Sequence, residues 1–278
     1  MANIIGILTT SHVPALGKAI HLNLQQEPYW KPFFDGFPPI RNWLNEVKPD
    51  IVISVYNDHG LNFFLDKQPT FAIGTAPEYV SEDEGWGIPT MPTFPGEEDL
   101  AWHIRDHLIR SDFDMVTCQE MLVDHAFTLP MALLWPDQKW PVKSIPICVN
   151  TVLFPLPSTQ RCYALGEAVG KAIAGFPSDA KVLVIGSGGL SHQLEGERAG
   201  FINKPFDLKF MQSMIDDPTW ATRFSDIDLV EQTGNEGVEL LNWLVARATL
   251  PGKVKLLHEN LHIPISNTAA ATMLMVPA

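Results

Sequence analysis

Four of the nine histidines stand shortly after apolar, strand-like runs of the chain, and they are His12, His59, His125 and His192. A single histidine at the end of a strand usually makes only a structural hydrogen bond. Four histidines that converge on one edge of a sheet indicate a chemical site, because two neutral imidazoles and one carboxylate form the facial triad that binds non-haem Fe(II). The same donors also suit zinc, so the residue types alone do not choose the metal.

The carboxylate of such a triad has two candidates in the segment GNEGVE, residues 234–239. Glu236 and Glu239 stand three residues apart and share one face if the segment begins a helix. A glutamate in a first helical turn is most often a surface residue that the helix dipole favours. The spacing therefore leaves both glutamates open and does not show that either binds a metal.

Other motifs in the chain are weaker. The segment GSGGLS, residues 186–191, begins like the dinucleotide-binding pattern G-x-G-x-x-G but lacks its last glycine. His103 and His107 form H-x-x-x-H without the glutamate of H-E-x-x-H sites, which indicates an ordinary helix face. The other histidines have no supporting pattern and are interpreted as structural, namely His21, His258 and His262.

The elements that must position the histidines alternate between strand-like and helix-like runs. Apolar runs predict strands at 4–8, 50–56, 115–121, 144–152 and 181–186, with a last apolar element at 269–276. Helical spacing of apolar residues predicts helices at 38–47, 97–109, 161–174, 206–215 and 236–248. This alternation predicts one domain over residues 1–278, a layered α/β/α sandwich around a mostly parallel sheet. Ligands of such sheets bind outside the carboxyl ends of the strands, where the four histidines are expected.

One loop has an unusual composition. The segment GWGIPTMPTFPG, residues 85–96, is rich in proline and glycine. Long ordered loops of this kind often cover a site, although a surface connection explains the composition equally well.

Composition excludes several classes of partner. The formal net charge is −13, which disfavours nucleic acids and anionic membrane surfaces, since both need a basic footprint. The three cysteines form no C-x-x-C pair, so we expect a reducing, cytoplasmic environment. We find no signal peptide and no apolar stretch of membrane-spanning length.

Seven segments, in order along the whole chain, carry a resemblance to a known family. They are TSHVPALG (10–17), VYNDHG (55–60), DEGWG (83–87), VDHAFTLP (123–130), GGLSHQLEGERAGFINKPFD (188–207), GNEGVELLNWL (234–244) and HIPISNTA (262–269). Together they resemble the catalytic, beta-type chain of class III extradiol ring-cleavage dioxygenases, in the branch of protocatechuate 4,5-dioxygenase and gallate dioxygenase. Seven matching segments are far more specific than any single motif.

The resemblance implies a role for each matching residue. It implies Fe(II) as cofactor, bound by His12, His59 and Glu239 rather than Glu236. It implies that His192 is the acid–base residue and that His125 lines the site for oxygen and substrate. Ser266 and Asn267 match a segment that approaches the carboxylate of the substrate. All these positions are intact, which disfavours a non-catalytic binding protein.

The function that the resemblance implies is extradiol cleavage of a catecholic aromatic acid by O2. We rank protocatechuate first as the substrate, and gallate or its 3-O-methyl ether second. Gallate-type relatives usually continue into a region equivalent to a small alpha subunit, whereas this sequence stops at Ala278. We therefore expect a separate small alpha subunit and a higher oligomer, with a homodimer closed by the 85–96 loop as the alternative. From another class of enzyme, the rival is a zinc hydrolase on a similar α/β fold.

Overall fold

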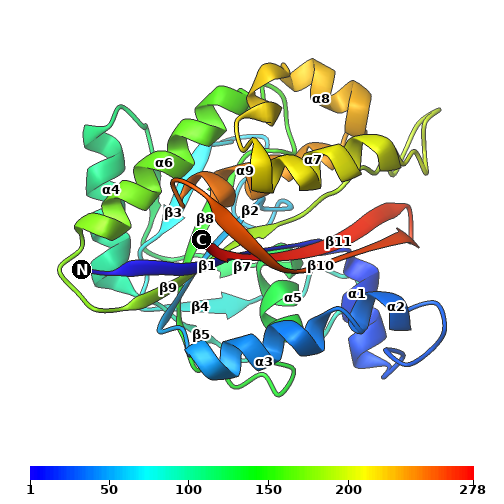
Figure 1. The fold of residues 1–278 in the computed structure, drawn as a ribbon, viewed down its shortest axis with the longest axis horizontal. Coiled ribbons are helices and arrows are strands. Elements are labelled where there is room, and N and C mark those ends of the chain that lie inside the picture. Colours follow the sequence, from blue (N-terminus) through cyan, green and yellow to red (C-terminus); the bar gives the residue numbers. More distant parts are fainter.

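The structure is a computed structural model that describes residues 1–278. Its centre is an eight-stranded sheet (Figure 1). In spatial order the strands are β10 (Val254–Ile265), β11 (Thr268–Pro277), β1 (Asn3–Thr10), β9 (Lys181–Ser187), β2 (Ile51–Tyr56), β8 (Lys143–Val149), β3 (Phe71–Gly74) and β6 (Val116–Cys118). A small second sheet has the order β5 (Phe94–Pro95), β4 (Glu78–Ser81) and β7 (Leu122–Val123).

The middle of the large sheet is parallel and its margins are mixed. The pairings of β1 with β9, β9 with β2, and β2 with β8 are parallel, as is that of β3 with β6. The pairings of β11 with β1, β10 with β11, and β3 with β8 are antiparallel. The predicted layered α/β fold with a mostly parallel sheet is confirmed.

Helices cover both faces of the sheet (Figure 1). Two apolar clusters fill the space between the layers. One face carries α4 (Glu98–Arg110), α6 (Thr159–Gly175), α7 (Lys204–Asp216), α8 (Asp226–Thr233) and α9 (Leu240–Ala248). The other face carries α1 (Pro14–His21), α2 (Lys31–Phe34), α3 (Phe37–Val47) and α5 (His125–Leu134). A short 3₁₀ helix, η1 (Trp220–Arg223), precedes α8.

Strand periodicity divides the core between the two faces. Along β2, Ile53 and Val55 pack into one cluster, whereas Val52 and Tyr56 pack into the other. Successive side chains of a strand point to opposite faces, and both faces are covered here. The central strands must therefore be apolar on both sides, which explains the continuous apolar runs of the sequence.

The structure corrects three of the predicted elements. The predicted strand at 115–121 is only the three-residue β6, at the outer edge of the sheet. The predicted helix at 236–248 is divided into the 3₁₀ helix η2 (Gly237–Glu239) and α9. The last apolar element, at 269–276, is strand β11 and forms a hairpin with β10, which the sequence analysis did not predict. None of the helices combines the length and the apolar character that crossing a membrane requires.

Candidate functional site

The candidate site lies where the three central parallel strands end. Thr10 at the end of β1 is paired with Ser187 at the end of β9, and Val55 of β2 is paired with Gly186 of β9. The carboxyl ends of these neighbouring strands therefore meet at one edge of the sheet. The loops that follow them carry His12, His59 and His192, as the sequence analysis predicted.

His125 reaches this edge by another route than the predicted one. It does not follow a strand of the large sheet, because β6 lies at the far margin. It is instead the first residue of α5, and the carboxylate of Asp124 caps this helix by accepting a hydrogen bond from the backbone N–H of Ala126 at 2.9 Å. The cap directs the first turn of the helix, and with it His125, towards the site.

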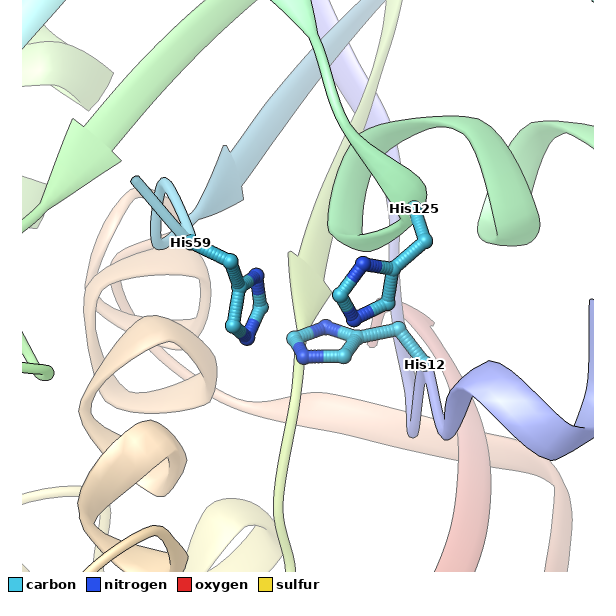
Figure 2. A group of neighbouring side chains, drawn as sticks. All are labelled: His12, His59 and His125. Carbon is cyan, nitrogen blue, oxygen red and sulfur yellow. The ribbon is translucent and has the colours of Figure 1, made fainter. Parts of the chain in front are cut away.

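Three histidine rings lie against one another at the centre of the site, as Figure 2 shows. The ring centroids are 5.2 Å apart for His12 and His59, 5.3 Å for His12 and His125, and 4.3 Å for His59 and His125. The rings come from three separate parts of the chain, so only the folded sheet edge brings them together.

Glu239 completes the cluster from the beginning of α9. Its Oε1 atom lies 3.2 Å from Nε2 of His12 and 3.5 Å from Nε2 of His59. Its Oε2 atom accepts a hydrogen bond of 2.9 Å from the backbone N–H of Gly189. Glu236, the other candidate, accepts a hydrogen bond from the backbone N–H of Leu194 and has no contact with these histidines. The geometry therefore brings Glu239, not Glu236, to the histidines.

Gly188 permits this close approach of the carboxylate. Its φ is +124°, a conformation that residues with a side chain rarely adopt. A Cβ atom at this position would lie 2.7 Å from Cβ of Glu239 and 2.9 Å from its Oε2 atom. A glycine is thus required where the loop after β9 passes Glu239.

Each histidine of the site has a partner at its Nδ1 atom. The pairs are His12 with Oγ of Ser187 (2.9 Å), His59 with Oδ2 of Asp124 (3.0 Å), His125 with Oε1 of Glu84 (2.7 Å) and His192 with the carbonyl of Leu190 (2.8 Å). The carboxylates and the carbonyl can only accept, and the Ser187 hydroxyl donates to the carbonyl of Ala126. All four imidazoles therefore carry a proton on Nδ1, and in the neutral form each Nε2 has a lone pair, which at His59 lies 3.1 Å from Nδ2 of Asn57.

The cluster is rich in hydrogen-bond acceptors and carries the negative charge of Glu239. Lone pairs on Nε2 of His12 and His59 face the same carboxylate oxygen of Glu239. Burial by itself would lower the pKa of His59, but the carboxylates of Asp124 and Glu239 outweigh it and raise the pKa to about 10. Burial would raise the pKa of Glu239, but His12 and His59 hold it well below its usual value. The cluster thus requires positive charge, as a proton or as a metal ion.

The spacing of these atoms fits a single metal ion. Ligand atoms that bind one ion at about 2.0–2.2 Å lie about 3–3.5 Å from one another. The distances from Glu239 to His12 and His59 fall in this range. Nitrogens of His12, His59 and His125 lie within 4.8 Å of one another and form an alternative ligand set. We favour Glu239 as the third ligand because it supplies negative charge at the shorter distances.

His192 lies beside the cluster and not within it. Its Nε2 atom is 3.9 Å from Oε2 of Glu239. It lines a cavity of about 460 Å³ that opens over the cluster and also contains His12, His59, His125 and Glu239. Trp86 from the 85–96 loop lines the same cavity, and its ring centroid is 6.3 Å from that of His125. The loop that the sequence analysis singled out therefore forms part of the cavity wall.

The two predicted substrate-binding residues lie at the tip of the β10–β11 hairpin. Ser266 lines the cavity, and its backbone N–H donates to the hydroxyl of Tyr29 at 2.8 Å. Asn267 is exposed and is not among the residues that line the cavity, whereas Thr268 is. The cavity thus contains one of the two predicted residues, together with the residue that follows them.

The residues that orient the histidines were not predicted from the sequence. Asp124, Glu84 and Ser187 hold Nδ1 atoms, and the amide of Asn57 donates to Oε1 of Glu239 at 3.0 Å. Three of these four stand within the quoted segments VYNDHG, DEGWG and VDHAFTLP. For Asn57 and Asp124 the available signal was a histidine one or two residues away in the sequence, whereas the partner of Glu84 stands 41 residues away.

The fold and this site define a class of protein: a layered α/β protein with a histidine–carboxylate cluster at the carboxyl edge of a parallel sheet. Residues 6–273 match the family described as the catalytic LigB subunit of aromatic ring-opening dioxygenase. The chain belongs to this family, as the resemblance predicted.

Individual relatives agree with this assignment. The chain is 37% identical over 194 residues to a gallate dioxygenase of Pseudomonas putida, a match that covers 69% of this chain and 57% of the relative. It is 29% identical over 258 residues to a 2,3-dihydroxyphenylpropionate/2,3-dihydroxicinnamic acid 1,2-dioxygenase of Comamonas testosteroni, with 77% and 78% covered. A protein of the same name from Rhodococcus jostii is 30% identical over 221 residues, with 79% and 66% covered. The chain thus spans little more than half of the gallate dioxygenase.

Proposed function

We propose that this protein is an Fe(II)-dependent extradiol dioxygenase that opens the ring of a catecholic aromatic acid with O2. The observation that carries the proposal is the convergence of Nε2 of His12 and Nε2 of His59 on one oxygen of Glu239. Two neutral imidazoles and one carboxylate are the donor set of non-haem Fe(II) oxygenases. Membership of the family of aromatic ring-opening dioxygenases supports the same reaction.

His12, His59 and Glu239 are the residues that would hold the iron. When bound, Fe(II) supplies a positive charge that lowers the pKa of the substrate hydroxyls, together with the redox chemistry that O2 requires. Ser187 and Asp124 orient the two imidazoles through their Nδ1 atoms. Such partners fix the tautomer and the direction of the ligating nitrogen.

His192 is proposed as the acid–base residue. Its Nδ1 proton is donated to the carbonyl of Leu190, so the lone pair of a neutral ring is on Nε2. Nε2 lies in the cavity beside Glu239, where a substrate hydroxyl would lie next to the iron ligands. His192 would accept the hydroxyl proton there and return it later to an oxygen of the opened product.

His125 is proposed to line the position of substrate and O2. It is buried, and burial lowers its pKa, which keeps the ring neutral near pH 7. Glu84 accepts both its Nδ1 proton and its backbone N–H, at 2.7 and 2.6 Å. The ring is thus held in one orientation against His59.

Protocatechuate is our first candidate substrate. The gallate dioxygenase relative makes gallate, or its 3-O-methyl ether, the second candidate.

We also propose that a partner subunit covers the cavity. Trp86, Val152 and Leu194 line the cavity yet are 57%, 47% and 49% exposed. A small partner subunit over these side chains would exclude water from the reaction, and a homodimer closed by the 85–96 loop is the alternative.

Oxygen uptake tests the proposal. The protein is loaded anaerobically with Fe(II) or Zn(II), and O2 consumption is measured with protocatechuate, gallate and 3-O-methylgallate, alone and with a small subunit added. We expect uptake with Fe(II) only and a ring-opened product. Absence of uptake with all three acids, with and without the subunit, would contradict the proposed reaction. Full turnover by the chain alone would contradict the required partner.

A further inference from the structure

Lys18 lies on the wall of the candidate active-site cavity, although no motif of the sequence pointed to it. Helix α1 begins two residues after His12, and Pro14, Ala15 and Lys18 all line the cavity. Residues three and four apart share one face of a helix, so this face of α1 forms part of the wall. Lys18 stands four residues beyond Pro14, about 6 Å further along the helix axis and away from the histidine cluster.

The ammonium group of Lys18 forms no ion pair within the protein. Among the residues that line the cavity, Lys18 is the only lysine or arginine. It takes part in no ion pair with a carboxylate within 4.0 Å. The side chain is exposed, so its ammonium group lies at the solvent side of the cavity.

The cavity otherwise disfavours an anion. Its two carboxylates are Glu239, at the histidine cluster, and Glu236, and the whole chain has a formal net charge of −13. A ligand carboxylate that moves from water into this cavity loses solvation free energy, and only a nearby cation can compensate that loss. Lysine suits this purpose because its ammonium is a compact charge on a flexible stem that can reach a ligand.

We propose that Lys18 selects for substrates that carry a carboxylate, by pairing with this group while the diol faces the histidine cluster. The inference rests on the proposed function and deepens it. It assigns the two ends of the substrate: the diol to the cluster at His12, and the carboxylate to the part of the cavity wall that Lys18 and Ser266 form. A catechol without an acid group would gain nothing from Lys18.

Anaerobic binding of a matched pair of ligands tests this inference. Protocatechuate carries a charged carboxylate on the ring, whereas its methyl ester carries a neutral group that is one methyl larger. Their dissociation constants are measured with the Fe(II)-loaded wild type and with the variants Lys18→Met and Lys18→Arg. Lys171→Met, which removes an exposed charge on α6, is the matched control.

We expect Lys18→Met to weaken binding of the acid about ten-fold, the effect of one hydrogen bond to a charged group, and to leave the ester within about two-fold. Lys18→Arg retains the preference for the acid, and Lys171→Met changes neither ligand. Equal effects of Lys18→Met on both ligands, or no effect on either, would overturn the assignment. Oxygen uptake by the wild type reports separately on the proposed reaction, so that failure of one inference is distinguishable from failure of the other.

Discussion

Asp124 joins the end of β2 to the start of α5 through His59. Its Oδ2 atom accepts hydrogen bonds from the backbone N–H and from Nδ1 of His59, at 2.8 and 3.0 Å. Burial would raise the pKa of Asp124, but the hydrogen bond and the charge of His59 lower it to about 2. The carboxylate is therefore ionised at all ordinary pH values and holds the ring with Nε2 towards Glu239.

Asp124→Asn is expected to weaken Fe(II) binding by about 10–100-fold, the usual effect of losing a partner that orients a metal ligand. An asparagine oxygen can still accept from Ala126, but the amide nitrogen then faces the two N–H donors of His59, so the thermal unfolding midpoint should fall as well. Metal titration of the apoprotein measures the affinity. Unchanged affinity in a folded variant would show that His59 needs no such orientation.

Glu239→Gln is expected to abolish stoichiometric Fe(II) binding, because the amide is neutral and its oxygen is a weaker ligand. Glu236→Gln is the matched comparison, since this residue lies in the same cavity but does not contact the histidines, and it should keep its metal. Metal content after desalting decides between them. The assignment of the carboxylate is wrong if the two variants behave in the opposite way.

His192→Phe is expected to retain Fe(II) and to lose roughly 10²–10⁴-fold in kcat, the usual contribution of acid–base catalysis. The physical reason is that Nε2 of His192 lies in the cavity without belonging to the metal cluster. Metal content and oxygen uptake are measured on the same preparation. A variant that loses its iron would place His192 among the ligands.

Glu84→Ala is expected to lower kcat/KM about ten-fold or more, because it releases two charge-assisted hydrogen bonds to His125 and frees the segment that carries Trp86. Glu82→Ala is the control, since Glu82 is exposed and bonds only to the next residue. Steady-state oxygen uptake compares the two variants. If both retain wild-type kcat/KM, the contact of Glu84 with His125 has no part in catalysis.

Asp207 is expected to make stability depend on pH. Burial raises the pKa of this carboxyl to about 6, although Ser191 donates to it through its backbone N–H and its hydroxyl. The folded state thus binds the proton more tightly than the unfolded state, so the free energy of unfolding falls as the pH rises from about 4 to about 6. The contribution is about 3 kcal/mol.

Denaturant unfolding at pH 4, 5, 6 and 7 checks this expectation. The decrease in the free energy of unfolding should be smaller in Asp207→Asn than in the wild type, because the amide does not titrate. Other groups titrate in this range, so the difference between the two proteins is the quantity to compare. Identical pH profiles would show that the pKa of Asp207 is not raised by burial and that this carboxyl does not contribute to the pH dependence of stability.

Much of the fold and several residues of the site followed from the sequence alone. Apolar runs such as 181–186 indicate strands that are buried on both faces, and they predict a covered, largely parallel sheet. Because parallel strands present their carboxyl ends at one edge, His12, His59 and His192 could be placed together before any contact was known. The resemblance named Glu239, which spacing alone could not separate from Glu236.

Only the tertiary structure decided which atoms meet. Asp124, Glu84 and Ser187 fix the histidine tautomers through contacts that span from 41 to 175 residues of chain. Lys18 lines the cavity because one face of helix α1 packs beside it. Asn267 does not line the cavity, although the neighbouring Ser266 does. Periodicity reports which face of an element is buried. The direction of a side chain in a loop depends on what the rest of the chain places around it, and local sequence does not contain that information.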